Sequence, residues 1–152
     1  MAGNLAIGQS GRRTMQWSGI IFVNRRGEVL LNLRDDKPEI AWPNAWDLIG
    51  GVVEAGETPD ECIVRETMEE TGEALGSLQP FRSYSVPLRD GREAQLHVYY
   101  ASLDKRADEL VLGEGQEHRF FAPSALSSIT IVRGIEGVLR DFLASPEYLN
   151  RR

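Results

Sequence analysis

The stretch GGVVEAGETPDECIVRETMEETG (residues 50–72) places seven acidic side chains within 23 positions. Its glycines are typical of a loop. Thr58, Pro59 and Glu61 then form a helix-start signature, with an N-cap threonine, a proline at the first helical position and a capping-box glutamate. Gly72 is the residue type that favours a left-handed helix end. The stretch therefore predicts a loop followed by a helix that begins at Pro59 and ends at Gly72.

This helix is expected to have two different sides. At about 100° per residue, the acidic side chains gather on one of them, which carries Glu66, Glu69 and Glu70, with Glu73 between them. The other side is more apolar, and we expect it to pack on the core of the protein through Val64 and Met68, with Thr71 beside them.

An acidic run of this kind is usually solvated surface. Here, however, Glu66 and Glu70 are four residues apart with no basic residue between them on that face, and such like-charge pairs destabilise a helix. Glu69 and Glu70 also lie near the C-terminal end, where the helix dipole disfavours anions. A bound cation would relieve both effects. Oxygen-only ligands favour Mg²⁺, with Mn²⁺ as a substitute, and Mg²⁺ commonly shares its coordination with substrate phosphates.

Composition limits the classes of protein to be considered. The chain has 152 residues, 41% of them hydrophobic and 26% charged, and we expect a single domain over residues 1–152 with an N-terminal tail at residues 1–13. The net charge of −6 disfavours binding to a nucleic-acid duplex. Cys62 is the only cysteine, which rules out an internal disulfide. No apolar run is long enough for a signal or a membrane helix, so a cytoplasmic location is the default expectation.

Apolar patterning predicts an α/β or α+β layered fold. Strand-like segments and turns indicate two hairpins and a short strand that enters the acidic stretch, at residues 14–34, 80–103 and 46–51. A short helical turn is expected at Pro123 and Ser124. Near the end of the chain, apolar side chains at helical spacing predict an amphipathic helix that contains Ile131, Ile135, Val138, Leu139 and Phe142.

The acidic stretch resembles a known family motif. Its fixed residue types and spacings reproduce those of the Nudix box, namely Gly51, Glu57, Arg65–Glu66, Glu69–Glu70 and Gly72. The chain departs from the usual pattern at Ile49, where a proline is common, and at Thr67 and Glu73, where bulky aliphatic residues are usual. None of these departures removes a carboxylate, so the chain resembles a Nudix hydrolase.

The resemblance implies an α/β fold, a Nudix-type α/β/α sandwich in which a mixed β-sheet is flanked by the box helix and the C-terminal helix. It also implies Mg²⁺-dependent hydrolysis of a nucleoside diphosphate linked to another group X, by attack of water on the pyrophosphate. The partner would be a small nucleotide or diphosphate substrate, and a homodimer is compatible with the resemblance. Two other interpretations rank below hydrolysis: a non-catalytic nucleotide sensor, and an isoprenoid diphosphate isomerase.

Site roles follow from the resemblance position by position. Glu66 and Glu70 would be the main metal ligands, Glu69 a ligand directly or through water, and the Gly51 carbonyl and Glu114 further ligands. Arg65 would hold Glu57 in an ion pair that shapes the loop. For the general base, the candidates are Glu66 or Glu69, with Glu114 and Glu117 as alternatives.

Residues outside the box must recognise the rest of the substrate, and the candidate segments are DDKPEIAWPNAW (residues 35–46) and SVPLRDGREAQ (residues 85–95). Loop aromatic residues could stack on a base, and arginines near them could offset phosphate charge. The candidate substrate-binding residues are Arg34, Trp42, Trp46 and Glu117, with Phe81 and Tyr84 as further aromatic candidates. Cys62 and His97 are expected to be structural, whereas His118 could contact a ligand.

Overall fold

The computed structural model describes residues 14–151, so the tail expected at residues 1–13 lies outside the described part of the chain. A seven-stranded sheet forms its centre. The strands are β1 (Met15–Val23), β2 (Val29–Leu33), β3 (Trp46–Asp47), β4 (Ile49–Val52), β5 (Gln79–Pro87), β6 (Glu93–Ser102) and β7 (Glu117–Phe121). The helices are α1 (Pro59–Thr71), α2 (Ile135–Leu143) and α3 (Pro146–Leu149), with the 3₁₀ turns η2 (Ala107–Glu109) and η3 (Pro123–Ser128).

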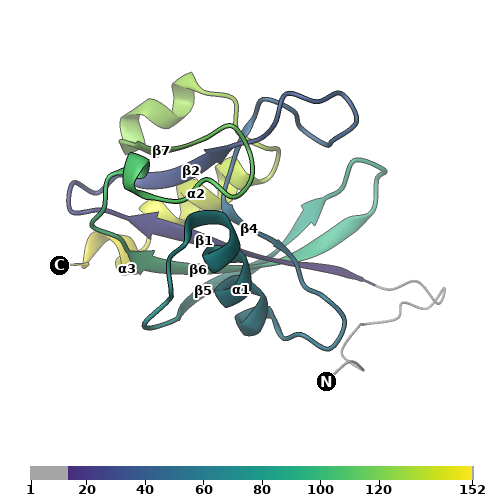
Figure 1. The fold of residues 1–152 in the computed structure, drawn as a ribbon, viewed down its shortest axis with the longest axis horizontal. Coiled ribbons are helices and arrows are strands. Elements are labelled where there is room, and N and C mark those ends of the chain that lie inside the picture. The colour runs from purple at the N-terminus through teal and green to yellow at the C-terminus, as the bar shows by residue number, and fades with distance from the viewer. Residues whose placement is uncertain (1–13, 152) are drawn as a thin grey trace.

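The sheet is mixed. Its main path runs β3-β2-β1-β6-β5, while β4 pairs with β1 and β7 pairs with β2 (Figure 1). Strands β1 and β6 are parallel, and the other named pairs are antiparallel. The two predicted hairpins are present as β1–β2 and β5–β6, and the short strand before α1 is present as β3 and β4.

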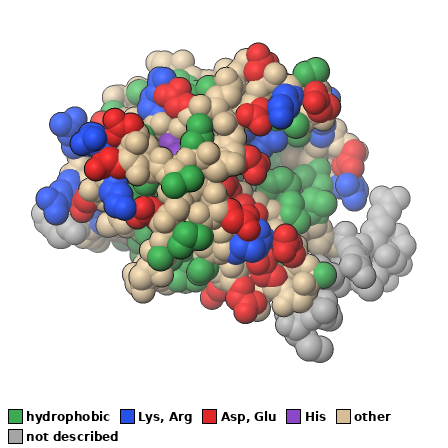
Figure 2. Space-filling model, viewed as in Figure 1, with side chains coloured by type: hydrophobic (Ala, Val, Ile, Leu, Met, Phe, Trp, Pro, Cys, Tyr) green, Lys and Arg blue, Asp and Glu red, His purple; other side chains and the backbone are tan. Residues whose placement is uncertain are grey.

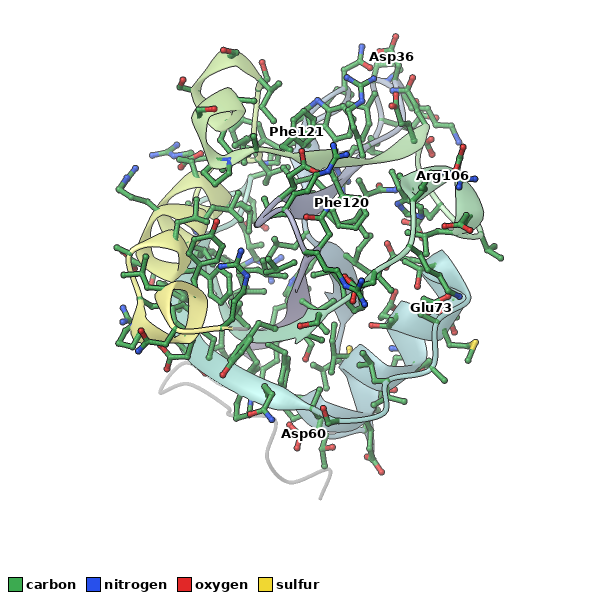
Figure 3. The ribbon with its side chains drawn as sticks, turned by 90° about the vertical axis from the view of Figure 1, so that its left-hand side faces the viewer. Asp36, Asp60, Glu73, Arg106, Phe120 and Phe121 are labelled. Atoms are coloured by element: carbon green, nitrogen blue, oxygen red, sulfur yellow. The ribbon has the colours of Figure 1, made fainter. Side chains whose placement is uncertain are left out.

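Two hydrophobic clusters lie on opposite faces of the sheet, because consecutive residues of a strand point to opposite sides. Ile20 of β1 belongs to the cluster that contains Ile63 of α1. Its neighbour Ile21 belongs to the cluster that contains Val138 and Phe142 of α2. The sheet therefore lies between α1 and α2, as Figure 3 shows from the side, and the predicted α/β/α sandwich is confirmed.

Helix α1 begins and ends where the sequence predicts. The Thr58 side chain accepts from the Glu61 N–H at 3.1 Å, and the Glu61 carboxylate accepts from the Thr58 N–H at 2.9 Å, so the capping box is complete. At the other end Gly72 adopts φ 77° and donates its N–H to the Met68 carbonyl. These two caps fix which residues of the acidic stretch are helical.

The expected orientation of α1 was wrong. Val64 and Met68 are 44% and 48% exposed, whereas Glu70 is only 6% exposed. Ile63 and Thr67, which lie between the two expected sides, are fully buried. The helix is therefore rotated so that part of its acidic side faces the protein interior, and this rotation leaves the apolar pair in solvent.

The C-terminal helix is confirmed as α2, with Ile135, Val138, Leu139 and Phe142 buried. Ile131 lies before this helix and instead bridges to Trp46. The helical turn expected at Pro123 is present as η3. No helix formed by residues 14–151 has the length and apolar character needed to cross a bilayer.

The contribution of the α1 capping box to the stability of the protein can be measured. Thr58→Ala should lower the free energy of unfolding by about 1 kcal/mol, because the Glu61 N–H loses its acceptor. Thr58→Ser, which keeps a hydroxyl, should remain close to wild type. Urea unfolding followed by circular dichroism measures both values. Equal stability of the alanine and serine variants would contradict a stabilising role of the cap.

Candidate active site

A cleft of about 570 Å³ opens beside α1 and β4, with Gly50 and Gly51 among its lining residues. Its carboxylates come from α1, from β3 and from the loops that precede α1 and β7. Its apolar lining comes from the cluster on the α2 face of the sheet. In Figure 2 acidic side chains gather over this part of the molecule, next to a hollow with hydrophobic side chains. The carboxylate-bearing lining residues include Glu54, Glu66, Glu70 and Glu114, and the apolar ones include Trp17, Leu48, Leu96 and Ile135.

Glu70 is the most buried acidic side chain of the cleft. One of its oxygens accepts the Gly50 N–H at 3.2 Å, and the Glu66 carboxylate lies close to it. Burial raises the pKa of Glu70 far above its usual range, and the neighbouring charges of Glu66 and Glu114 raise it further. A cation at this position would offset the repulsion between the neighbouring carboxylates.

The Glu66 carboxylate lies directly against the backbone of Gly51. A Cβ atom built on Gly51 would overlap the carboxylate oxygens of Glu66. The missing side chain at position 51 thus creates the space in which Glu66 approaches the β4 backbone, and this space explains why the motif needs a glycine there.

Arg65 connects the helix to the loop that precedes it. Its guanidinium pairs with Glu57 through two hydrogen bonds, of 2.7 and 2.9 Å, and also donates to the Val52 carbonyl at 3.2 Å. The same group contacts Glu66 at 2.9 Å and Glu69 at 3.3 Å. The hydrogen bonds from Arg65 lower the pKa of Glu57. The predicted ion pair is therefore present, and it fixes the loop beside the Glu66 carboxylate.

Glu114 reaches the cleft through a network that sequence reasoning did not predict. The Asn32 amide donates to the Glu114 carbonyl at 2.9 Å and to Nδ1 of His118 at 3.2 Å. The other ring nitrogen of His118 donates to the carbonyls of Glu70 and Val111. His118 is therefore a buried link between the C-terminal end of α1 and residues 111–114, rather than a residue that contacts a ligand.

The donor atoms of the cleft fit a hard divalent cation. Carboxylate oxygens of Glu66, Glu70 and Glu114 and the Gly51 carbonyl offer oxygen only, which is the chemistry that Mg²⁺ and Mn²⁺ prefer. Within residues 14–151, no three Asp, Glu, His or Cys side chains are already gathered in a ready-made metal cluster. The fit to a divalent cation thus rests on the oxygen donors and on the repulsion that the charges of Glu66 and Glu114 exert on Glu70.

Other candidate residues divide into those that reach the cleft and those that do not. Arg34 and Trp42 line it. Trp46 is only 8% exposed and packs edge-on against Phe121 in the core, which removes its ring from the cleft. The remaining candidates have partners elsewhere: Glu117 pairs with Arg119, Phe81 packs on Phe142, Tyr84 donates to Asp141, and Glu69 stays largely exposed beside Arg65.

Cys62 and His97 were expected to be structural, and both contact other parts of the protein rather than open space. The Cys62 thiol is buried against the carbonyls of Gly51 and Val52, and burial raises its pKa to about 11. His97 bridges the side chains of Ser83 and Gln16. Neither is among the residues that line the cleft.

Sequence reasoning missed other residues that line the cleft. Arg133 lies in a segment with no motif, so no sequence signal marked it, whereas Arg89 was not singled out but lies in the segment SVPLRDGREAQ (residues 85–95), which was expected to help recognise the substrate. Glu54 lies in the loop of the box but is not one of its fixed positions. Asp47 did carry a signal, since it is an acidic residue within the apolar segment WDLIGG. Burial raises the pKa of Asp47 to about 6, and the Leu48 N–H and Arg34 oppose this rise.

Comparison with known proteins gives independent information on the family of the chain. Residues 15–142 match the family model described as NUDIX domain. NAD-capped RNA hydrolase NudC of Pseudomonas aeruginosa is 31% identical over 137 residues, which cover 89% of this chain and 44% of that protein. An ADP-ribose pyrophosphatase of Methanocaldococcus jannaschii is 30% identical over 123 residues, which cover 80% of this chain and 69% of that protein. The chain thus spans less than half of the NudC protein.

Solved structures show the same fold at lower identity. A MutT protein from Methanosarcina mazei superimposes with a TM-score of 0.67 and 21% identity, over 91% of this chain and 96% of that one. DR0079 from Deinococcus radiodurans gives a TM-score of 0.71 and 18% identity, over 89% and 95%. Because the family model covers most of the chain and includes the whole acidic cleft, the protein belongs to the NUDIX domain family.

Proposed function

We propose that this protein is a Mg²⁺-dependent pyrophosphohydrolase that cleaves a nucleoside diphosphate linked to another group X. One observation carries the proposal: Glu66, Glu70 and Glu114 line one cleft, and Glu70 is buried beside another carboxylate. This arrangement is costly in an empty protein, because like charges in a buried site oppose each other. A cation and a diphosphate would together balance the charge.

Within this proposal, Glu66, Glu70, Glu114 and the Gly51 carbonyl would hold Mg²⁺, and Mn²⁺ could substitute for it. Glu69 would act through water, because it does not line the cleft. When bound, the cation would neutralise the diphosphate and acidify a nearby water. Arg65 positions the Glu66 carboxylate and does not itself face the substrate.

The general base must reach the attacking water. Of the four candidates, Glu66 and Glu114 line the cleft, whereas Glu69 and Glu117 do not. Glu54 also lines the cleft, and its side chain is 68% exposed with a single long contact of 3.8 Å to Arg65. We therefore assign proton removal to Glu66, Glu114 or Glu54, each of which has oxygens available in the cleft.

The names of the relatives suggest which substrates to test. NAD-capped RNA, ADP-ribose and RNA occur in the names of proteins that resemble this chain. All three can present a nucleoside next to a phosphoanhydride, which is the chemistry that the cleft would accept. The sensor hypothesis differs in one respect, since a sensor would bind such a molecule without cleaving it. A cytoplasmic location and a homodimer stay predictions.

A substrate panel tests the proposed reaction. Nucleoside triphosphates, nucleotide sugars, dinucleoside polyphosphates, ADP-ribose, NADH and 5′-capped or triphosphorylated RNA should be incubated with the protein and Mg²⁺. We expect at least one class to release a phosphorylated product, and EDTA should abolish that release because the carboxylates need their cation. Product release followed by chromatography measures the outcome.

Two results would contradict the proposal. Hydrolysis that persists in EDTA would remove the metal from the mechanism. Tight binding of a nucleotide without turnover of any class, with Mg²⁺ or Mn²⁺ present, would favour the sensor.

Arg65→Lys tests the positioning role of the arginine. Lysine keeps the charge but cannot bond Glu57 at two points while also contacting Glu66. We expect kcat/KM to fall by about 10-fold or more and the Mg²⁺ concentration for half-maximal activity to rise, as for other residues that orient metal ligands. Arg119→Lys is the matched control, because Arg119 pairs with Glu117 outside the cleft. An unchanged Mg²⁺ dependence in the Arg65 variant would refute the role.

A further inference from the structure

The cleft contains a carboxylate that the proposed hydrolysis does not use. Asp47 lies on β3, opposite Asn32 of β2, and its side chain is 20% exposed. It lines the same cleft as the acidic cluster but is not among the charges that raise the pKa of Glu70. Asp47 is therefore a separate acidic group within the substrate cleft.

The partners of Asp47 leave its hydrogen-bonding capacity incompletely used. One oxygen accepts the Leu48 N–H at 2.7 Å. The other lies 3.6 Å from the Arg34 guanidinium, which is beyond a good hydrogen bond. Arg34 itself is held by the Ala41 carbonyl at 2.8 Å. A carboxylate can accept about four hydrogen bonds, so Asp47 has room for N–H donors from a ligand.

The surroundings of this carboxylate suit a flat ring. Leu48, Leu96 and Ile135 give the cleft an apolar lining, and the Leu48 side chain packs directly against Gly19, where a Cβ would lie 3.1 Å from it. An apolar lining with a few polar groups, here Asp47 and Arg34, is typical of a small-molecule site, and a flat base fits such a lining.

We propose that Asp47 selects a nucleobase with two adjacent N–H donors, which is the edge of guanine, and that Arg34 contacts the neighbouring carbonyl of that base. This inference rests on the proposed function only in taking the cleft as a nucleotide site. Guanine presents N1–H and the 2-amino group side by side, next to the O6 acceptor. Adenine, cytosine and uracil have no two adjacent donors. A sugar would place hydroxyl groups rather than a flat apolar face against Leu48 and Leu96.

The test uses nucleosides without phosphate, in EDTA, so that it does not depend on metal binding or hydrolysis. Guanosine, inosine and adenosine are titrated into the full chain and followed by ligand-observed NMR. We expect guanosine to bind about 10-fold more tightly than inosine, which lacks the 2-amino group, and than adenosine. A loss of one charge-assisted hydrogen bond accounts for a factor of this size.

Asp47→Asn should reduce this preference to about threefold or less, because the amide replaces an acceptor by a donor. Asp141→Asn is the matched control: Asp141 lies 3.9 Å from Arg82, outside the cleft, and its variant should keep the wild-type preference. Thermal unfolding verifies that both variants are folded. If the Asp47 variant does not fold, the relative affinities of the wild-type protein for guanosine, inosine and adenosine decide whether the proposal holds.

Equal binding of guanosine and inosine to the wild-type protein would overturn the proposal. Retention of the full preference by a folded Asp47→Asn variant would do so as well. Hydrolysis of nucleotides without any base preference would overturn this inference and leave the proposed function intact. Selective binding of guanosine without hydrolysis of any substrate would support this inference and contradict the proposed function.

Discussion

The burial of Glu70 beside Glu66 is the constraint on which the site depends. A buried carboxylate prefers to be neutral, and a second carboxylate in contact with it strengthens that preference. Helix α1 is nevertheless oriented so that Glu70 is buried while Val64 and Met68 are exposed. An orientation that hid the apolar pair would gain hydrophobic stabilisation. The observed orientation is therefore understandable as a functional one, in which the acidic side forms part of a cleft.

The rest of the fold holds this arrangement in place. At the beginning of α1 the capping box fixes the first turn, and the Ser18 hydroxyl donates to the Pro59 carbonyl at 2.8 Å. At its end, the N–H of Gly113 donates to the Glu70 carbonyl at 3.1 Å, and His118 donates to the same carbonyl. The helix is thus tied at both ends to the strands and loops that carry the other cleft residues. Local caps and long-range hydrogen bonds together set where the carboxylates lie.

Sequence reasoning predicted what depends on local chemistry. The ends of α1 follow from its capping residues and Gly72, and the layers follow from apolar periodicity. It failed where tertiary packing decides. The rotation of α1 depends on the cleft, which no periodicity describes. Trp46 follows the ordinary preference of a large aromatic side chain for the core.

Residues outside the motif also depend on tertiary packing for their place in the cleft, which the sequence alone does not predict. Arg34 and Trp42 reach the cleft as predicted, although their segment has no regular period. Arg89, Arg133 and Asp47 reach it through sheet pairing and loop paths that bring distant parts of the chain together. Arg89 lies in a segment expected to recognise the substrate, and Asp47 carried a visible sign as a charged residue within an apolar strand segment. A motif thus located the carboxylates, whereas the fold was needed to find what accompanies them.

The central claim is that the Glu66–Glu70 pair is built to hold a divalent cation. Isothermal titration of Mn²⁺ into the wild-type protein and into Glu70→Gln and Glu73→Gln variants tests it most directly. Glu73 lies two residues past α1 and pairs with Lys105, so it is a matched carboxylate without a place in the cleft. We predict that Glu70→Gln weakens Mn²⁺ binding by about 10-fold or more, whereas Glu73→Gln does not. Equal affinity of all three proteins for Mn²⁺ would contradict the account.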